Sequence, residues 1–341
     1  MFLAWEFEPD IVIGTLLACL IYAAGMKRRG YGTRRHMLRH VSYFAGVASI
    51  FLALESPIDA FADQLFWVHQ IQHLLLRMIG PMLIMLSAPQ AFLVRGLPRA
   101  LREGALAPLA SAGIMRSLFG LLASAPVITM LFVAALYVWQ YPPIHAAAIL
   151  NDGIHYTMHI SMLAAGLLFF WRIFDPRPAP KGLAYGKRLM MLLMVMLTQI
   201  GLGAYLTLKT EVLYPAYEIA RAMSSMKPLA DEMIGGFIVW VPSSMMCLVA
   251  VIVVIHAWGK EETRAEERWT RSERNIPSRP VTGAELIARA QPKNRMLAIG
   301  VAGFVVMMFG IAIFAGVLDH MNANTPGGLF AHSGPVIKII R

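Results

Sequence analysis

Long apolar runs alternate with short polar segments along almost the whole chain. Eight of these runs are close to the roughly 20 residues that an α-helix needs to cross the hydrocarbon of a bilayer. They predict an all-α protein, a polytopic transmembrane helix bundle with eight spans. The expected spans cover residues 10–26, 40–55, 65–88, 118–139, 154–174, 189–208, 234–258 and 296–317.

The polar segments between the runs predict the orientation of the bundle. Every second segment is rich in Lys and Arg, so that four segments contain 24 of the 30 basic residues and the other segments and termini contain 5. Basic loops remain on the cytoplasmic side, so both termini are expected to be periplasmic, in a multi-pass protein of the bacterial inner membrane. The four basic segments are 27–40, 89–117, 172–188 and 259–295.

Composition excludes several classes of protein. Hydrophobic residues make up 57% of the chain and charged residues 15%, whereas an ordinary soluble domain carries roughly a quarter charged residues and a disordered chain is poor in apolar ones. The net charge of +10 is interpreted as a cytoplasmic surface that faces the anionic lipid of the bilayer; no nucleic-acid partner is expected.

The charge distribution also divides the chain into four parts. Residues 1–39 form an N-terminal anchor span with a basic cytoplasmic loop, and residues 40–258 form the membrane core. Residues 259–295 alternate Glu and Arg in the manner of a solvated helix, a charged cytoplasmic tether. Residues 296–341 add the eighth span and a periplasmic tail.

Two pairs of histidines stand out within the spans. His69 and His73 lie four residues apart in the third span, and His155 and His159 lie four apart in the fifth. Residues at this spacing share one face of a helix, and ionisable groups inside a membrane are costly enough to suggest a function. We therefore expect the four imidazoles to converge in the outer half of the bundle as metal ligands. The pair His36/His40 stands among arginines and is interpreted as a cationic, lipid-facing segment.

Soft side chains near these pairs suggest which metal. Met162 follows His159 on the same helical stripe and is counted as a fifth ligand. Imidazole with thioether or thiolate donors suits copper, in particular Cu(I). Arg77, one turn below His73, needs an acceptor inside the membrane, and an ion pair with Glu55 is expected. The supporting residues are Asp152, Arg77, Glu55, Met158, Met246 and Cys247.

The histidines also fit other uses. The run from His69 to His73 differs from the HExxH of zinc proteases by Gln70, which cannot act as the general base. A haem with one axial ligand from each pair, for example His73 with His159, remains an alternative, which would make the protein a membrane oxidoreductase. A copper transporter is a further alternative, although no second histidine cluster is expected at the cytoplasmic side.

Three blocks of sequence in the core resemble the CtaG family of membrane assembly factors for cytochrome c oxidase. The resemblance covers about residues 40–258, and the sequence departs from the family pattern at Glu232 and Met233 and in its eighth span. The blocks are His69-x-x-x-His73-Leu-Leu with Pro81 and Pro89; His155-x-x-x-His159 with Gly166, Phe169, Phe170, Trp171 and Asp175-Pro176-x-Pro178; and Asp231-x-x-x-Gly235-Gly236-x-Ile238-x-Trp240-x-Pro242.

The resemblance implies a non-enzymatic role in the maturation of haem-copper oxidases. The histidine pairs would hold copper at a periplasm-facing site and support its delivery to an oxidase metal centre. The implied partners are oxidase subunits and a periplasmic copper chaperone.

The topology can be tested with reporter fusions. Fusions after Arg39, Asp63 and Arg341 are expected to report cytoplasm, periplasm and periplasm, because the basic asymmetry fixes the side of each loop. A cytoplasmic signal at Arg341 would contradict the eighth span.

Overall fold

A computed structural model describes residues 7–29, 34–177, 179, 182–217 and 226–274. The chain divides into two compact units, residues 1–266 and 267–341, and the second is described only in the last turns of α15. All described elements are helical, which confirms the expected all-α class. They are α1 (Pro9–Arg29), α2 (Arg34–Glu55), α3 (Pro57–Ala62), α4 (Phe66–Leu74), η1 (Leu75–Ile79), α5 (Gly80–Leu86), α6 (Gln90–Gly96), α7 (Arg99–Leu101), η2 (Arg102–Leu106), α8 (Ala107–Ser111), α9 (Gly113–Leu122), α10 (Ala125–Gln140), α11 (Pro142–Ile149), α12 (Asp152–Ile173), α13 (Tyr185–Leu208) and α15 (Pro228–Arg274).

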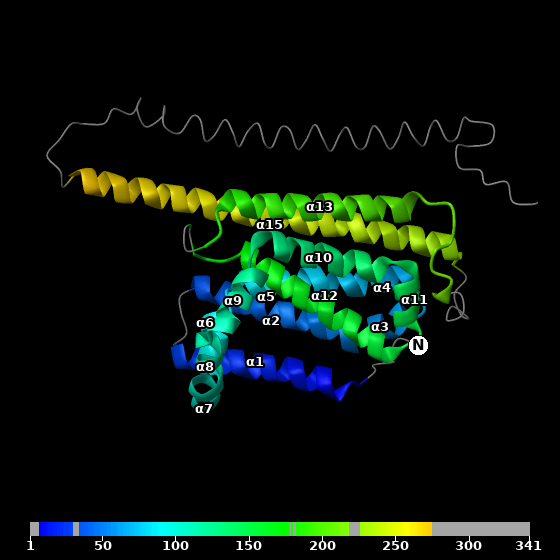
Figure 1. The fold of residues 1–341 in the computed structure, drawn as a ribbon, viewed down its shortest axis with the longest axis horizontal. Coiled ribbons are helices and arrows are strands. Elements are labelled where there is room, and N and C mark those ends of the chain that lie inside the picture. Colours follow the sequence, from blue (N-terminus) through cyan, green and yellow to red (C-terminus); the bar gives the residue numbers. More distant parts are fainter. Residues whose placement is uncertain (1–6, 30–33, 178, 180–181, 218–225, 275–341) are drawn as a thin grey trace, which may run out of the picture. The chain divides into compact units, whose positions relative to one another are not determined.

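Several of these helices are suited to a membrane. Five are individually long and apolar enough to cross one, namely α1, α2, α12, α13 and α15, and the number rises to eight if three bent helix pairs each count as one span. The expected eighth span, 296–317, and the periplasmic tail lie outside the described residues. α15 continues without a break from the membrane core into the expected tether as far as Arg274 (Figure 1).

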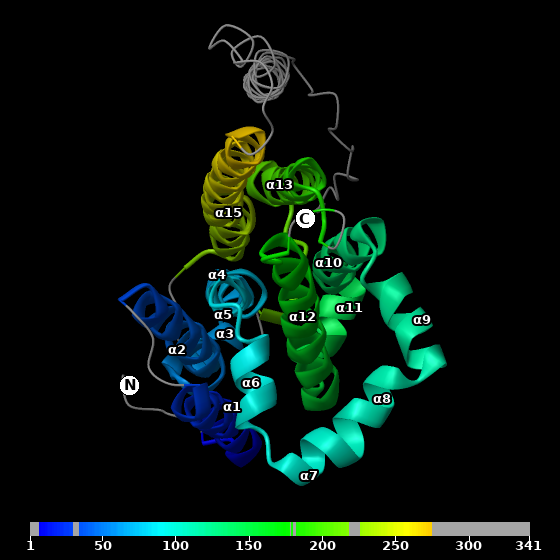
Figure 2. The same cartoon turned by 90° about the vertical axis from the view of Figure 1, so that its left-hand side faces the viewer.

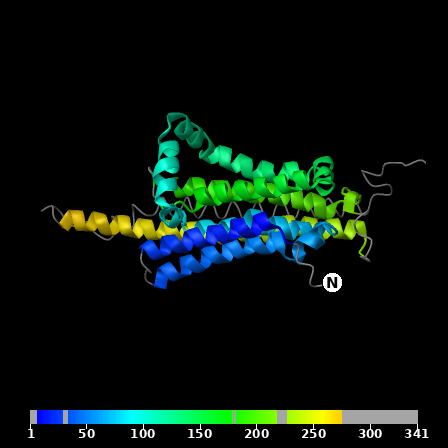
Figure 3. The same cartoon turned by 90° about the horizontal axis from the view of Figure 1, so that it is seen from below.

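Sharp bends follow the third and fourth expected spans, and the fourth span begins at Ala125, after a break that follows α9. The helix from Phe66 to Leu86 turns by 80° into α6, and α10 turns by 73° into α11. Prolines explain both bends: Pro89 follows Ala88, whose φ of 52° is left-handed, and Pro142 begins α11 because it cannot continue the helix before it. The expected cytoplasmic segment 89–117 is itself mostly helical, and its helices run across the bundle instead of along it (Figure 3).

α12 occupies the middle of the first unit, between α4–α5 on one side and α10–α11 on the other (Figure 2). At Gly166 this packing is so close that an added Cβ would lie 2.4 Å from the backbone oxygen of Arg77. α13 and α15 approach each other similarly at Gly203 and Gly236. Glycine permits such contacts, which stabilise helix pairs in lipid by close packing.

Near the junction of α1, α2 and α6, aromatic residues form a second packed region. Tyr22 and Tyr43 stack with ring centroids 3.7 Å apart. His40 is buried there and its Nδ1 lies 3.0 Å from the Tyr22 hydroxyl. The interpretation of His40 as lipid-facing was therefore wrong: α2 turns this side chain toward α1 and Phe92.

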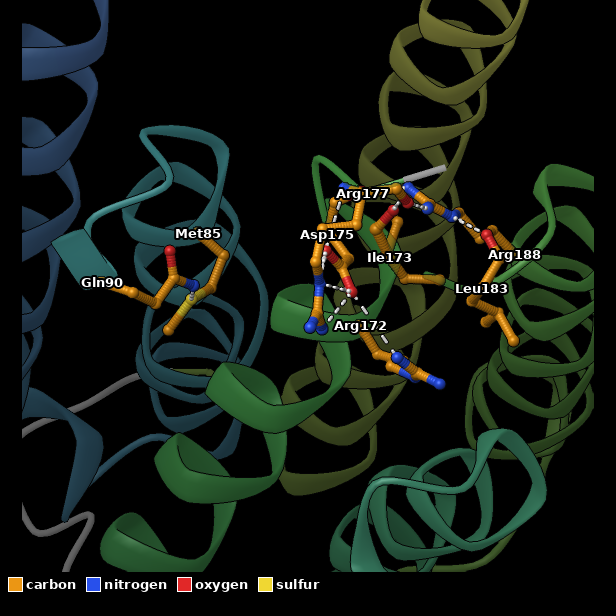
Figure 4. A network of polar contacts seen from close by, with 8 residues as sticks. All are labelled: Met85, Gln90, Arg172, Ile173, Asp175, Arg177, Leu183 and Arg188. Carbon is orange, nitrogen blue, oxygen red and sulfur yellow. Dashed lines mark hydrogen bonds and ion pairs between the residues drawn. The ribbon is translucent and has the colours of Figure 1, made fainter. Parts of the chain in front are cut away.

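The loop between α12 and α13 is held by arginines (Figure 4). Arg188 donates hydrogen bonds to the carbonyl oxygens of Ile173, Asp175 and Leu183, at 3.1, 2.7 and 2.9 Å. Partial burial favours a higher pKa for Asp175, but hydrogen bonds from Arg177 outweigh it and hold the pKa below its usual value. Asp175, the first residue of the Asp-Pro-x-Pro block, therefore has a structural role in this loop. In the same view, the Gln90 amide lies 3.9 Å from the Met85 sulfur and joins α6 to α5.

The contact at Gly166 provides a test of the fold. We expect Gly166→Ala to lower the free energy of unfolding by about 1–3 kcal/mol, because the new methyl group would overlap the Arg77 carbonyl. Thermal unfolding of the purified protein in detergent measures the change. Gly186→Ala is the control, because nothing lies within 4 Å of a Cβ at that helical position. Equal unfolding temperatures for the two variants would contradict the close contact.

Candidate metal centre

The structure brings the four predicted histidines together. His69 and His73 come from α4, and His155 and His159 come from the first two turns of α12. The close pairs of rings have centroids 4.3–6.0 Å apart, both within each helix and between the two. The i, i+4 spacing puts each pair on one face, and the packing of α12 turns the two faces toward each other.

Three of the imidazoles are placed to share an ion. One ring nitrogen from each of His69, His155 and His159 lies within 4.8 Å of the other two. Bonds of about 2 Å place the ligands of one ion about 3–4 Å apart, so small side-chain rotations would close this set. His73 lies directly beside these three histidines, and its Nε2 is 2.8 Å from Nε2 of His69.

Each imidazole in this cluster leaves one buried nitrogen without a hydrogen-bond partner among the described residues. These atoms are Nδ1 of His69 and His73 and Nε2 of His155 and His159. A buried polar atom without a partner costs about 1–3 kcal/mol, so four in one place need an explanation, and a bound ion is one. The donor set of neutral imidazoles fits copper.

A fifth histidine, His145, forms a wall of this cluster, and sequence reasoning gave it no role. Its ring centroid lies 5.2 Å from that of His69, but both of its nitrogens are already engaged. Nδ1 lies 2.8 Å from the Trp139 carbonyl oxygen and Nε2 lies 2.8 Å from the Tyr217 hydroxyl. No second histidine lies four residues from His145, so it does not form a pair in the sequence. The one indication of its position is Pro142, which begins the helix α11 that carries His145.

A distant carboxylate fixes the helix that carries His69 and His73. Asp231, fully buried on α15, accepts hydrogen bonds from the backbone N–H groups of Phe66 and Trp67, at 3.1 and 2.9 Å. These are the first residues of α4, and Leu65 before them provides no side-chain cap. A carboxylate at a helix N-terminus satisfies its unpaired donors and interacts favourably with its dipole.

The next residue, Glu232, holds the loop after α13. It accepts hydrogen bonds from the backbone N–H groups of Leu213 and Tyr214, at 2.9 and 2.8 Å, and it pairs with Lys209. The departure from the family pattern at this position thus has a structural role.

The predicted sulfur ligands lie in other contacts. Met158 and Met162 are fully buried in a cluster with Ala148, packed against Trp139. Cys247 is buried with its sulfur 3.8 Å from the Gln199 amide, and Met246 is half-buried. These are packing contacts, so the role of Met162 as a ligand stays a prediction.

Arg77 does not pair with Glu55, contrary to expectation. Its guanidinium lies 3.9 Å from the centre of the Phe132 ring and donates to the Phe132 carbonyl oxygen at 3.3 Å. The Gln199 amide oxygen, when turned toward it, accepts at 3.1 Å. The Glu55 carboxylate instead accepts from the backbone N–H of Glu8 at 3.2 Å. The two groups lie at different depths, because Glu55 is the last residue of α2, whereas Arg77 lies about 16 Å beyond the start of α4 along the helix.

Comparison with known proteins identifies the family of the chain. Residues 20–261 match the model of the cytochrome c oxidase caa3 assembly factor family, CtaG. The chain belongs to this family. It is 26% identical over 272 residues to uncharacterized proteins of Mycobacterium bovis and Mycobacterium tuberculosis, covering 77% of this chain and 40% of each relative. An uncharacterized protein of Mycobacterium leprae is 25% identical over 271 residues, covering 78% of this chain and 41% of the relative. The chain thus spans about two-fifths of the length of these relatives. No solved structure matches it.

The cap on α4 can be tested by substitution. We expect Asp231→Ala to lower the free energy of unfolding by about 1–3 kcal/mol, because it leaves two backbone donors of α4 unpaired. Asp231→Asn keeps one oxygen acceptor and should fall between the wild type and Asp231→Ala. Thermal unfolding measures both, and a wild-type unfolding temperature for Asp231→Ala would show that α4 needs no cap from α15.

Proposed function

We propose that this CtaG family member binds copper, as Cu(I), at the four-histidine cluster and supports its delivery to a metal centre of a haem-copper cytochrome c oxidase. The observation that carries the proposal is the convergence of four imidazoles that each leave a buried nitrogen without a partner. In this proposal the protein is not an enzyme, and the copper is its cargo.

The surroundings of the cluster favour delivery over transport across the membrane. Arg77 follows His73 in the chain by four residues, and its guanidinium is buried with no carboxylate paired to it among the described residues. A cation that moved inward from the histidines would meet this positive charge in a medium that screens it poorly. An ion bound at the cluster is therefore expected to return to the side from which it came.

Close helix packing favours copper over haem. A haem between His73 and His159 would have to separate the two helices that carry these residues. The contact of Gly166 with the Arg77 carbonyl, two turns along α12, holds the two helices together. The other two imidazoles of the cluster occupy the space beside this pair.

The setting of the proposed activity follows from the family and from the basic segments. The cluster would face the periplasm of a bacterial inner membrane, with both termini on that side. Oxidase subunits would receive the copper, and a periplasmic copper chaperone would supply it.

Metal analysis tests the proposal. Purified wild-type protein incubated with Cu(I) should retain copper, and His73→Ala or His159→Ala should weaken binding by at least about 100-fold, because even residues that only support a ligand typically contribute 10–100-fold. His256→Ala is the matched control, since this histidine is exposed on α15. Oxidase from cells with the cluster variants should contain less copper. A Soret absorption band in the purified protein would favour haem instead, and wild-type protein without copper would refute the proposal.

A further inference from the structure

A cavity of about 620 Å³ lies between α1, α2 and α12, and it reaches the histidine cluster. Most of its wall is apolar, formed by side chains such as Ile50, Leu76 and Leu163. One end is different, because His155 and His159 lie there together with acidic residues. The acidic residues of the wall are Glu8, Asp59, Asp63 and Asp152.

Exposure falls steadily from this acidic end into the cluster. The Asp63 side chain is 55% exposed and the His155 side chain 17%. His159 is 8% exposed, His73 3% and His69 0%. Because His159 lines the cavity with an unpartnered, buried Nε2, the cavity gives the cluster a side chain that a ligand can reach from outside.

Two of the carboxylates are placed beside the outermost histidine. An oxygen of Asp63, in the loop after α3, lies 3.9 Å from Nδ1 of His155. Asp152 begins α12, three residues before His155, so the two share a helix face. Tyr156 on the neighbouring turn donates a hydrogen bond of 2.7 Å to Asp10, which ties α12 to α1 at this place.

We infer that Asp63 and Asp152 form the port through which the copper ion reaches and leaves the cluster, with His155 as the first ligand that it meets. This inference rests on the proposed function. The two carboxylates attract a cation to the mouth of the cavity, and the imidazoles behind them bind it.

The carboxylates and the imidazoles differ in what they can do for a Cu(I) ion. Carboxylates are hard ligands and add little to the affinity for Cu(I), whereas imidazole suits it. Charges of one sign at the mouth of a cleft raise the association rate of an oppositely charged ligand by 10- to 1,000-fold. The port residues should therefore act mainly on the association rate of copper, and the affinity should fall by no more than the association rate does.

The test is a kinetic comparison on the full chain in detergent. Cu(I) is presented as a complex with a weak chromophoric chelator, and its transfer to the protein is followed by stopped-flow absorption. Asp63→Asn and Asp152→Asn are tested singly and together, against Glu211→Gln, which removes an exposed charge shortly after the end of α13. We expect the double variant to bind about 10-fold more slowly at low salt. The difference should shrink at 1 M salt, where the screening length is about 3 Å, and stoichiometry should be that of the wild type.

The outcomes distinguish this inference from the proposed function. If the double variant binds as fast as Glu211→Gln while His73→Ala fails to bind, the port is wrong and the copper site stands. If the variants lose affinity at unchanged association rates, the carboxylates are ligands and the port is also wrong. If the wild type binds no copper, both proposals fall. Because Asp63 lies in a loop, the single variant Asp63→Asn tests the port without a change in α12. The unfolding temperature of each variant shows whether it is folded.

Discussion

The structure depends on one constraint, that polar groups taken out of water inside a membrane must find partners within the protein. Asp231 accepts hydrogen bonds from two backbone N–H groups at the start of α4. The Arg77 guanidinium lies against the Phe132 ring and donates to the Phe132 carbonyl oxygen. His145 has a partner for each nitrogen. The four imidazoles between α4 and α12 each leave one nitrogen without a partner among the described residues. Other buried atoms, such as Nε of Arg77 and the amide nitrogen of Gln70, lack a partner as well, so what marks the site is that four such atoms belong to imidazoles that converge.

Much of the site follows from local sequence. Two histidines four residues apart share a helix face whatever surrounds them, so the pairs were visible in the chain, and the apolar runs gave the helices. Gly166 then allows the close packing that turns one face toward the other. What could not be predicted depends on breaks in regular geometry. The π turn at Leu75–Ile79 carries Arg77, which contacts Phe132 and not Glu55, and the bend before Pro142 precedes the short helix that brings His145 to the cluster.

Contacts between residues far apart in the chain could not be predicted from the sequence either. A pattern of helical spacing does not reveal that a carboxylate on α15 caps α4, or that His40 turns inward to Tyr22. The family pattern marked the block at Asp231 as important, but only its contacts show that it holds the histidine helix in place. The proposal of copper as the metal rests on the donor atoms, which the sequence and the structure describe alike.

The cap on α4 also has a consequence for the order in which the protein is made. Asp231 lies 165 residues beyond the helix end that it caps, so the ribosome has produced most of the membrane core before α4 receives its cap. Until α15 has inserted, the first turn of α4 has unpaired donors and the histidines on it lack a fixed frame. The arrangement of the four histidines is thus a property of the finished bundle, and a nascent chain does not yet have it.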